Sequence, residues 1–213
     1  MAYNADAIID ACSKALKSNA DNAMRTYGGG APENDNQPYS PKGYGSSRVD
    51  FWSEFFVETL KNSLHLTNAY VDPRLATIVP KVVGTETYKG VRIGAGPVDG
   101  RPAYSVGNGG HYTSATSPTY LMTYSEVKFI EAEARFRKGD LAGSYAALAA
   151  GVAADMEKAG VSTANANAYI AKMDENVGVS KVSMSHIMTQ RYISMVFDPE
   201  IWVDMRRMNY STS

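Results

Sequence analysis

The sequence predicts a mainly α-helical fold, with long irregular loops and at most a small β-hairpin. Apolar residues recur at helical spacing in several segments, and two stretches rich in Gly, Pro, Asn and Ser separate these segments. The strand-like runs are short. Apolar residues make up 44% of the 213-residue chain, which is enough to bury a sizeable core. We therefore treat residues 1–213 as a single domain.

The first expected helix covers residues 4–25. Four apolar residues recur there at helical spacing: Ile8, Ile9, Cys12 and Leu16. Residues 26–49 follow as a loop-rich excursion. Loops of this length are uncommon in a compact domain unless they bind something or are mobile. The segment is therefore a candidate binding loop.

A second helix is expected over residues 50–66, with Asp50 as its N-cap. Its apolar side would carry four residues: Phe51, Phe55, Leu60 and Leu64. Pro73 prevents a continuing helix, and residues 76–118 form a second loop-rich excursion. Because that excursion contains the strand-like residues 78–83 and 90–93, we expect at most a short hairpin within it.

Residues 119–160 are expected to form two antiparallel helices that are similar to one tetratricopeptide-type hairpin. Gly139 would end the first helix in a left-handed conformation, and Asp140 would cap the second. An apolar stripe follows the second helix: Leu141, Tyr145, Leu148, Val152 and Met156. One such hairpin cannot bury its apolar face alone, so further helices must cover it.

The remainder of the chain supplies candidates for those covering helices. A polar segment rich in Ala and Asn follows Gly160. Another helix is expected over residues 183–197, and a short one after Asp198-Pro199.

Composition excludes several classes of protein. Lys and Arg number 21 against 22 Asp and Glu, and this balance argues against a dedicated nucleic-acid binder. The single Cys12 excludes a disulfide framework and a multi-cysteine zinc site. No apolar run reaches the roughly 20 residues of a membrane-spanning helix, and the N-terminus lacks the pattern of a signal peptide.

The sequence carries no positive sign of catalysis, and we expect no cofactor, metal or catalytic residue. The three histidines are scattered without metal-ligand spacing: His65, His111 and His186. The glycines of residues 94–100 lack the following helix that a phosphate-binding loop needs. A glycosidase could place its two carboxylates among the 22 acidic residues, so an unrecognised carbohydrate-active enzyme stays an alternative.

Four segments in a fixed order carry a resemblance to a known family. They are Asp72-Pro-Arg-Leu75, Pro118–Ala134, Ile187-Met-Thr-Gln-Arg-Tyr-Ile193 and Glu200–Tyr210. As a set they resemble the SusD/RagB family, the lipid-anchored nutrient-binding proteins on the outer membrane of Bacteroidetes. The resemblance covers roughly residues 50–210.

The resemblance implies a SusD-like fold and non-catalytic capture of glycans, oligosaccharides or peptides for a SusC-like TonB-dependent transporter. It implies a location on the extracellular face of the outer membrane, through a lipid anchor absent from this chain. The family's proteins are longer, so it implies that the chain is a central-to-C-terminal part. It also implies structural roles for seven motif residues: Asp72, Arg74, Gln190, Trp202, Asp204, Arg206 and Arg207.

Sugar recognition requires aromatic rings for the apolar face of a pyranose and polar partners for its hydroxyls. Six residues of the two excursions supply that mixture: Tyr39, Tyr44, Tyr104, Asn108, His111 and Tyr112. Trp52, at the start of an amphipathic helix, is better explained as a core residue. A helical scaffold that holds another protein, without a small ligand, is the other alternative.

Overall fold

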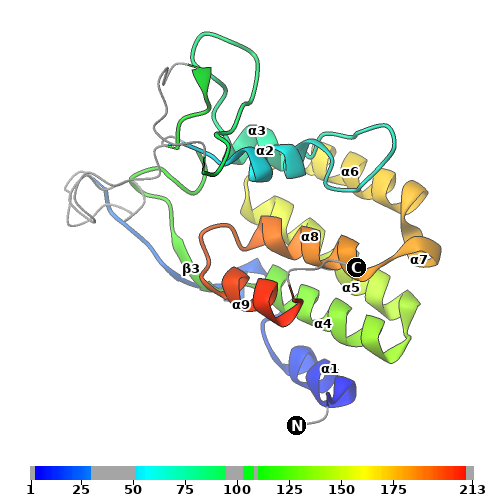
Figure 1. Ribbon diagram of the computed structural model, residues 1–213. Helices are drawn as coiled ribbons and strands as arrows, with labels where there is room; N and C mark the ends of the chain where they lie inside the picture. The colour runs from blue at the N-terminus through cyan, green and yellow to red at the C-terminus, as the bar shows by residue number, and fades with distance from the viewer. Residues whose placement is uncertain (1–2, 30–50, 95–102, 108–109, 210–213) are drawn as a thin grey trace.

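The mainly helical fold class is confirmed by the computed structural model, which describes residues 3–29, 51–94, 103–107 and 110–209 (Figure 1). Its α-helices are α1 (Ala5–Lys14), α2 (Glu54–Lys61), α3 (Arg74–Ile78), α4 (Tyr124–Lys138), α5 (Leu141–Lys158), α6 (Thr163–Asn176), α7 (Gly178–Lys181), α8 (Met184–Ser194) and α9 (Glu200–Arg207). A short 3₁₀-helix covers Asn19–Asp21. No helix among the described residues has the length and apolarity needed to cross a membrane.

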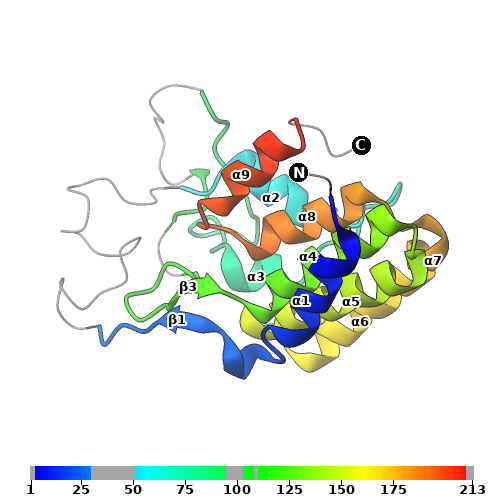
Figure 2. The same cartoon turned by 90° about the horizontal axis from the view of Figure 1, so that it is seen from below.

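The helices α4, α5, α6 and α8 form the body of the molecule, with α5 packed against the other three. The helix α1 lies across α4 on one side, as Figure 2 shows, and Lys138 forms a 2.5 Å ion pair with Asp6 there. The helices α2 and α3 lie at the opposite side of the body in Figure 1. The body therefore separates α1 from α2.

The turn between α4 and α5 has the predicted cap residues. Gly139 ends α4 with a φ of 85°, a left-handed conformation that glycine adopts without steric cost. The Asp140 side chain accepts a 2.9 Å hydrogen bond from the Gly143 backbone N–H. Further along, Gly151 of α5 faces the Phe129 ring of α4, and a Cβ on Gly151 would lie 2.8 Å from that ring. The two helices therefore pack closely because position 151 has no side chain.

Two apolar clusters make up the core. The first fills the space between α4, α5, α6 and α8, and its largest members include Phe129, Leu148, Met156, Tyr169 and Ile187. The second lies under α2 and α3, and it includes Trp52, Phe56, Leu60, Ile78 and Ile193. Trp52 is buried, which confirms its prediction as a core residue. Burial of these apolar side chains supplies the main driving force for folding.

The β-structure lies elsewhere than the sequence predicts. The strands β1 (Ala23–Arg25) and β3 (Thr119–Met122) pair antiparallel, with Ala23 opposite Met122. The expected helix over residues 4–25 was therefore too long, because α1 ends at Lys14. The first of the two helices expected within residues 119–160 begins only at Tyr124, since the Thr123 hydroxyl caps it by accepting the Glu126 N–H. The described part of 76–118 holds isolated bridges instead of a hairpin, one between Ser53 and Val91 and one between Phe51 and Val106.

One further expected helix begins later than predicted, and one helix was not predicted. The helix expected over residues 50–66 is α2, which begins after Ser53, because the Ser53 hydroxyl accepts a 3.2 Å hydrogen bond from the Phe56 N–H. The expected cap, Asp50, lies outside the described residues. The polar segment after Gly160 contains α6, a helix with only Tyr169 and Met173 buried among its described residues.

Candidate ligand-binding groove

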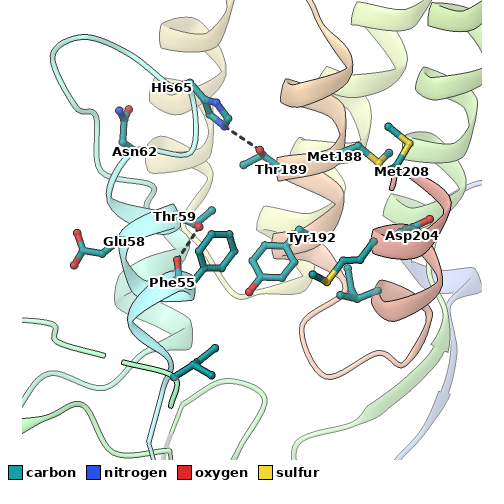
Figure 3. A pocket seen from close by; sticks show the side chains of 13 residues that line it. Phe55, Glu58, Thr59, Asn62, His65, Met188, Thr189, Tyr192, Asp204 and Met208 are labelled. Carbon is teal, nitrogen blue, oxygen red and sulfur yellow. Dashed lines mark hydrogen bonds between the residues drawn. The ribbon is translucent and has the colours of Figure 1, made fainter. Parts of the chain in front are cut away.

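A groove of about 900 Å³ lies between α2, α8 and α9 (Figure 3). One side is formed by α2 and the turn that follows it, the floor by α8, and the other side by α9. Its lining residues are Phe55, Glu58, Thr59, Asn62, His65, Ile93, Met188, Thr189, Tyr192, Ile201, Asp204, Met205 and Met208. Concave, mainly apolar sites with a few polar groups are the usual form of ligand pockets.

An aromatic pair lies in the groove, formed by the exposed Phe55 and the partly buried Tyr192. Phe55 is 63% exposed, and its ring meets the ring of Tyr192 edge-on at a centroid distance of 5.6 Å. The ring of Tyr192 also contacts the buried Phe56 at 5.9 Å, which fixes its position from below. Burial raises the pKa of Tyr192, so its hydroxyl stays a hydrogen-bond donor at neutral pH. The pair therefore combines a free ring face with a phenolic hydroxyl.

Most of the polar side chains around the groove already have partners. The Asn62 side-chain amide donates to the Leu66 carbonyl at 2.8 Å and accepts from the Leu66 N–H at 3.0 Å. His65 Nε2 lies 2.9 Å from the Thr189 hydroxyl, the contact drawn in Figure 3. Among the described residues, Glu58 forms an ion pair with Lys61, at 2.7 Å. Of these polar groups, the Glu58 carboxylate is therefore the one most available to a ligand.

The groove rests on a buried polar network centred on Arg74. Its guanidinium donates to both Asp72 oxygens at 2.9 and 2.6 Å, to Asp155 at 2.6 Å and to Gln190 at 2.5 Å. Gln190 in turn donates to the Tyr169 hydroxyl at 3.0 Å. Burial alone would lower the pKa of Arg74, but the Asp72 and Asp155 carboxylates raise it well above its ordinary value. Bidentate pairing of this kind fixes geometry as well as charge.

The network ties together elements that are distant in the sequence. Asp72 and Arg74 lie at the start of α3, Asp155 on α5, Tyr169 on α6 and Gln190 on α8. Lys158 Nζ lies 2.9 Å from the second Asp155 oxygen, which balances the two buried carboxylates with two buried cations. The floor of the groove is therefore held in place by fully paired charges.

A second set of ion pairs attaches α9 to the body. Asp204 lies 2.7 Å from Arg191 of α8 and 2.7 Å from Arg207 of its own helix. Arg207 also donates to the buried Glu133 of α4, at 2.9 Å for one of the two contacts. Burial would raise the pKa of Glu133, but Arg207 and Arg137 lower it below its ordinary value. The wall of the groove formed by α9 therefore depends on Glu133 and Arg191.

The predicted ligand-binding residues do not form one site. Tyr39, Tyr44 and Asn108 lie outside the described residues. Tyr104 is half-buried, 6.1 Å from the Phe51 ring and 4.9 Å below the Lys89 ammonium.

The structure does bring His111 and Tyr112 together, with their rings perpendicular at 4.8 Å. Tyr112, however, is only 6% exposed and belongs to the core cluster around Trp52. Its role as a stacking surface was therefore a wrong prediction, because a buried ring offers no face to a sugar.

The motif residues divide into two groups. Asp72, Arg74 and Gln190 are buried in the network, and Asp204 and Arg207 belong to the ion pairs of α9. Trp202 is 56% exposed and Arg206 is exposed, so their structural roles stay predictions.

Phe55 and Tyr192 are candidate functional residues that sequence reasoning missed. The sequence predicts Phe55 on the apolar side of its helix and places Tyr192 within the family motif, without a ligand contact for either residue. The signal was the succession Phe55-Phe56: two adjacent helical residues cannot face the same core, so one of the rings must point outward. No group of three or more His, Cys, Asp or Glu residues that could hold a metal ion is found in the part of the chain that the structure describes.

Comparisons with known proteins agree with the architecture. A family model named SusD-like_2, described as starch-binding associating with outer membrane, matches residues 2–212. A SusD homologue from Bacteroides fragilis has a similar solved structure, with a TM-score of 0.68 and 18% identity over 91% of this chain and 46% of that one. A SusD homologue from Parabacteroides distasonis gives a TM-score of 0.61 and 20% identity over 90% and 45%. No curated protein matches the sequence. The chain spans less than half the length of these solved structures.

Proposed function

The chain belongs to the SusD-like family, and from this premise we propose that it binds glycans without catalysing a reaction. In this proposal the bound oligosaccharide is passed to a SusC-like TonB-dependent transporter. The family's description associates its members with the outer membrane, and the cell surface is therefore the place where capture occurs.

The observation that carries the proposal is the exposed Phe55 ring in the groove. A phenyl ring that is 63% exposed loses favourable burial unless a ligand covers it. The C–H face of a pyranose is apolar and flat enough to cover such a ring, while the Tyr192 hydroxyl can donate to a sugar oxygen. The groove thus offers the two kinds of contact that sugar recognition requires.

The carboxylates of the groove support binding rather than catalysis. Asp204 is neutralised by Arg191 and Arg207, whereas a glycosidase acid needs a raised pKa beside a second carboxylate. Glu58 is exposed and pairs with Lys61. An enzyme in this groove would release new reducing ends from a glycan during long incubation, and we expect none.

The binding proposal predicts that Phe55→Ala abolishes or weakens glycan binding. Burying a phenyl ring against a ligand is worth about 1.5–3 kcal/mol, so we expect the affinity to fall by about tenfold or more. Isothermal titration of the chain against a panel of plant, host and microbial glycans measures this loss. Because Phe55 is 63% exposed, we expect the variant to keep its thermal unfolding midpoint.

Leu121→Ala is the matched control, since the Leu121 side chain on β3 is 72% exposed but does not line the groove. We expect it to bind glycans with unchanged affinity. Equal losses in both variants, or no loss in Phe55→Ala, would contradict the assignment of the groove. Binding of no glycan in the panel would favour the alternative of a helical scaffold for another protein.

A further inference from the structure

The walls of the groove carry more apolar side chains than a site for an unsubstituted sugar requires. Three methionines line it, Met188 on α8 with Met205 and Met208 at α9, together with Ile93 and Ile201. Methionine side chains are flexible and polarisable, so they close around small apolar substituents of variable position. An unsubstituted pyranose presents hydroxyls on most of its edges, and these hydroxyls need polar partners.

Few polar groups of the groove are left for such hydroxyls. Both polar atoms of Asn62 are used by Leu66, and both Asp204 oxygens face arginines. The hydroxyl of Thr59 donates to the Phe55 carbonyl at 2.7 Å. Glu58 and Tyr192 are thus the main polar groups open to a ligand. A hydroxyl-rich sugar would leave several of its groups desolvated and unpaired, at a cost in affinity.

The charge of the groove excludes another class of sugar. No Lys or Arg is found among the described residues that line it, while Glu58 carries an exposed negative charge. A uronic acid or a sulfated sugar would bring a second negative charge next to Glu58, and the neighbouring Lys61 is already paired with Glu58 at 2.7 Å. The ligand is therefore neutral.

We infer that the groove takes neutral oligosaccharides that carry acetamido groups, such as N-acetylated hexosamines; this inference rests on the proposed function. The acetyl methyl groups pack against the methionine and isoleucine side chains, and the pyranose face covers Phe55. The amide N–H of the acetamido group is a donor for a carboxylate such as Glu58, and its carbonyl is an acceptor for a hydroxyl such as that of Tyr192.

Three hexasaccharides with the same β-1,4 backbone test this inference by isothermal titration: chitohexaose, cellohexaose and fully deacetylated chitosan hexamer. They differ only at carbon 2, which carries an acetamido, a hydroxyl or an ammonium group. Hexagalacturonate serves as an anionic probe. We expect chitohexaose to bind about tenfold tighter than cellohexaose, since burying the extra methyl group of one acetamido substituent in an apolar pocket produces roughly that ratio. We expect no detectable binding of hexagalacturonate.

Two matched substitutions on α9 test whether the preference for chitohexaose over cellohexaose arises in the groove. Met205 lines the groove and is 43% exposed, whereas Val203 is 41% exposed and does not line it. Met205→Gln is expected to reduce the ratio between chitohexaose and cellohexaose severalfold without changing the thermal unfolding midpoint. Val203→Gln is expected to leave the ratio unchanged.

Four results would overturn the inference while glycan binding itself stands. They are equal affinity for cellohexaose and chitohexaose, tightest binding of the deacetylated hexamer, measurable binding of hexagalacturonate, and an unchanged ratio in Met205→Gln. The inference is also contradicted if the chain binds other glycans but none of these four oligosaccharides. If no glycan binds at all, the proposed function fails together with the inference.

Discussion

Arg74 shows how a single buried charge can organise a helical domain. A guanidinium without solvent is costly unless every donor is paired, and here Asp72, Asp155 and Gln190 accept its hydrogen bonds. Replacing the whole set by apolar residues could be neutral, but removing one partner leaves the others as unpaired buried charges. The contribution of Arg74 to stability can therefore be measured only when Arg74 is substituted and its partners are kept.

We predict that Arg74→Met destabilises the protein by about 3–5 kcal/mol, because two buried carboxylates lose their partner. Urea unfolding followed by circular dichroism measures the change. Arg92→Met, at an exposed position outside the network, is the control and should change stability by less than about 0.5 kcal/mol. A loss below about 1 kcal/mol in Arg74→Met would show that the network is not maintained in solution.

At the scale of elements, the strongest sequence signals were local ones. Gly139 and Asp140 mark the end of one helix and the start of the next through their own backbone chemistry, so α4 and α5 could be predicted. The strand β3 could not, because its partner β1 lies almost a hundred residues earlier. The helix α6 was also missed, since it buries Tyr169 and Met173 alone among its described residues and has little apolar periodicity.

The contact between Gly151 and Phe129 gives a prediction about the α4–α5 pair. In a free helix Gly→Ala is stabilising by about 1 kcal/mol, but here the new methyl group would lie 2.8 Å from the Phe129 ring. Overpacking of this kind costs about 1–3 kcal/mol, so Gly151→Ala should lower the stability measured by urea unfolding. The double variant with Phe129→Leu should lose less than the sum of the two single variants. Additive losses would mean that the two residues do not determine the spacing of the helices.

Acid sensitivity is expected at the boundary between α2 and α8. The His65 and His186 rings lie 5.6 Å apart, and His186 is in the first turn of α8, where a positive charge opposes the helix dipole. Burial lowers the pKa of all three histidines: His65, His111 and His186. The proximity of His65 lowers the pKa of His186 further. The folded state therefore takes up protons less readily than the unfolded state. Stability is fully present above the ordinary histidine pKa of about 6.5 and is lost as the pH falls below it.

Thermal unfolding midpoints between pH 7.5 and 5.5 test this expectation, in a range where most carboxylates stay ionised. The midpoint should fall with pH in the unmodified chain. His186→Gln removes one titrating group and the neighbour of the other, while glutamine can still bond to Ser183, so its midpoint should fall less steeply. Parallel slopes for the two proteins would exclude the histidine pair as the cause.

At the scale of the whole molecule, the groove joins segments that the sequence keeps far apart. Phe55 comes from α2, Tyr192 from α8 and Met205 from α9, and only the tertiary packing makes them neighbours. The fold class could be inferred from the sequence. The site could not, because the sequence does not show which aromatic side chains on different helices are exposed and which are buried. The loops that composition favoured contribute a single described residue, Ile93, to the groove.

The attachment of α9 to the body decides whether this groove exists at all. Glu133 of α4 pairs with Arg207, and it is the acidic contact that α4 makes with α9 among the described residues. Without it α9 keeps the Asp204–Arg191 pair, and Met208 at its end still packs against the first core cluster. The buried members of the two core clusters include no residue of α9, so the clusters are left intact. Glu133→Ala should therefore release α9 locally without unfolding the body.

Hydrogen exchange followed by mass spectrometry measures that release. In Glu133→Ala we expect the amides of residues 200–207 to exchange roughly tenfold faster, as the loss of about 1.4 kcal/mol of local stability would produce, while α5 keeps its protection. Glu131→Ala is the matched control: Glu131 lies on the same helix, but it pairs with Lys128 and Arg135 within α4. Glycan affinity should fall in the first variant only, because the groove loses one wall. Faster exchange throughout the chain would indicate global destabilisation and would contradict a separate attachment of α9.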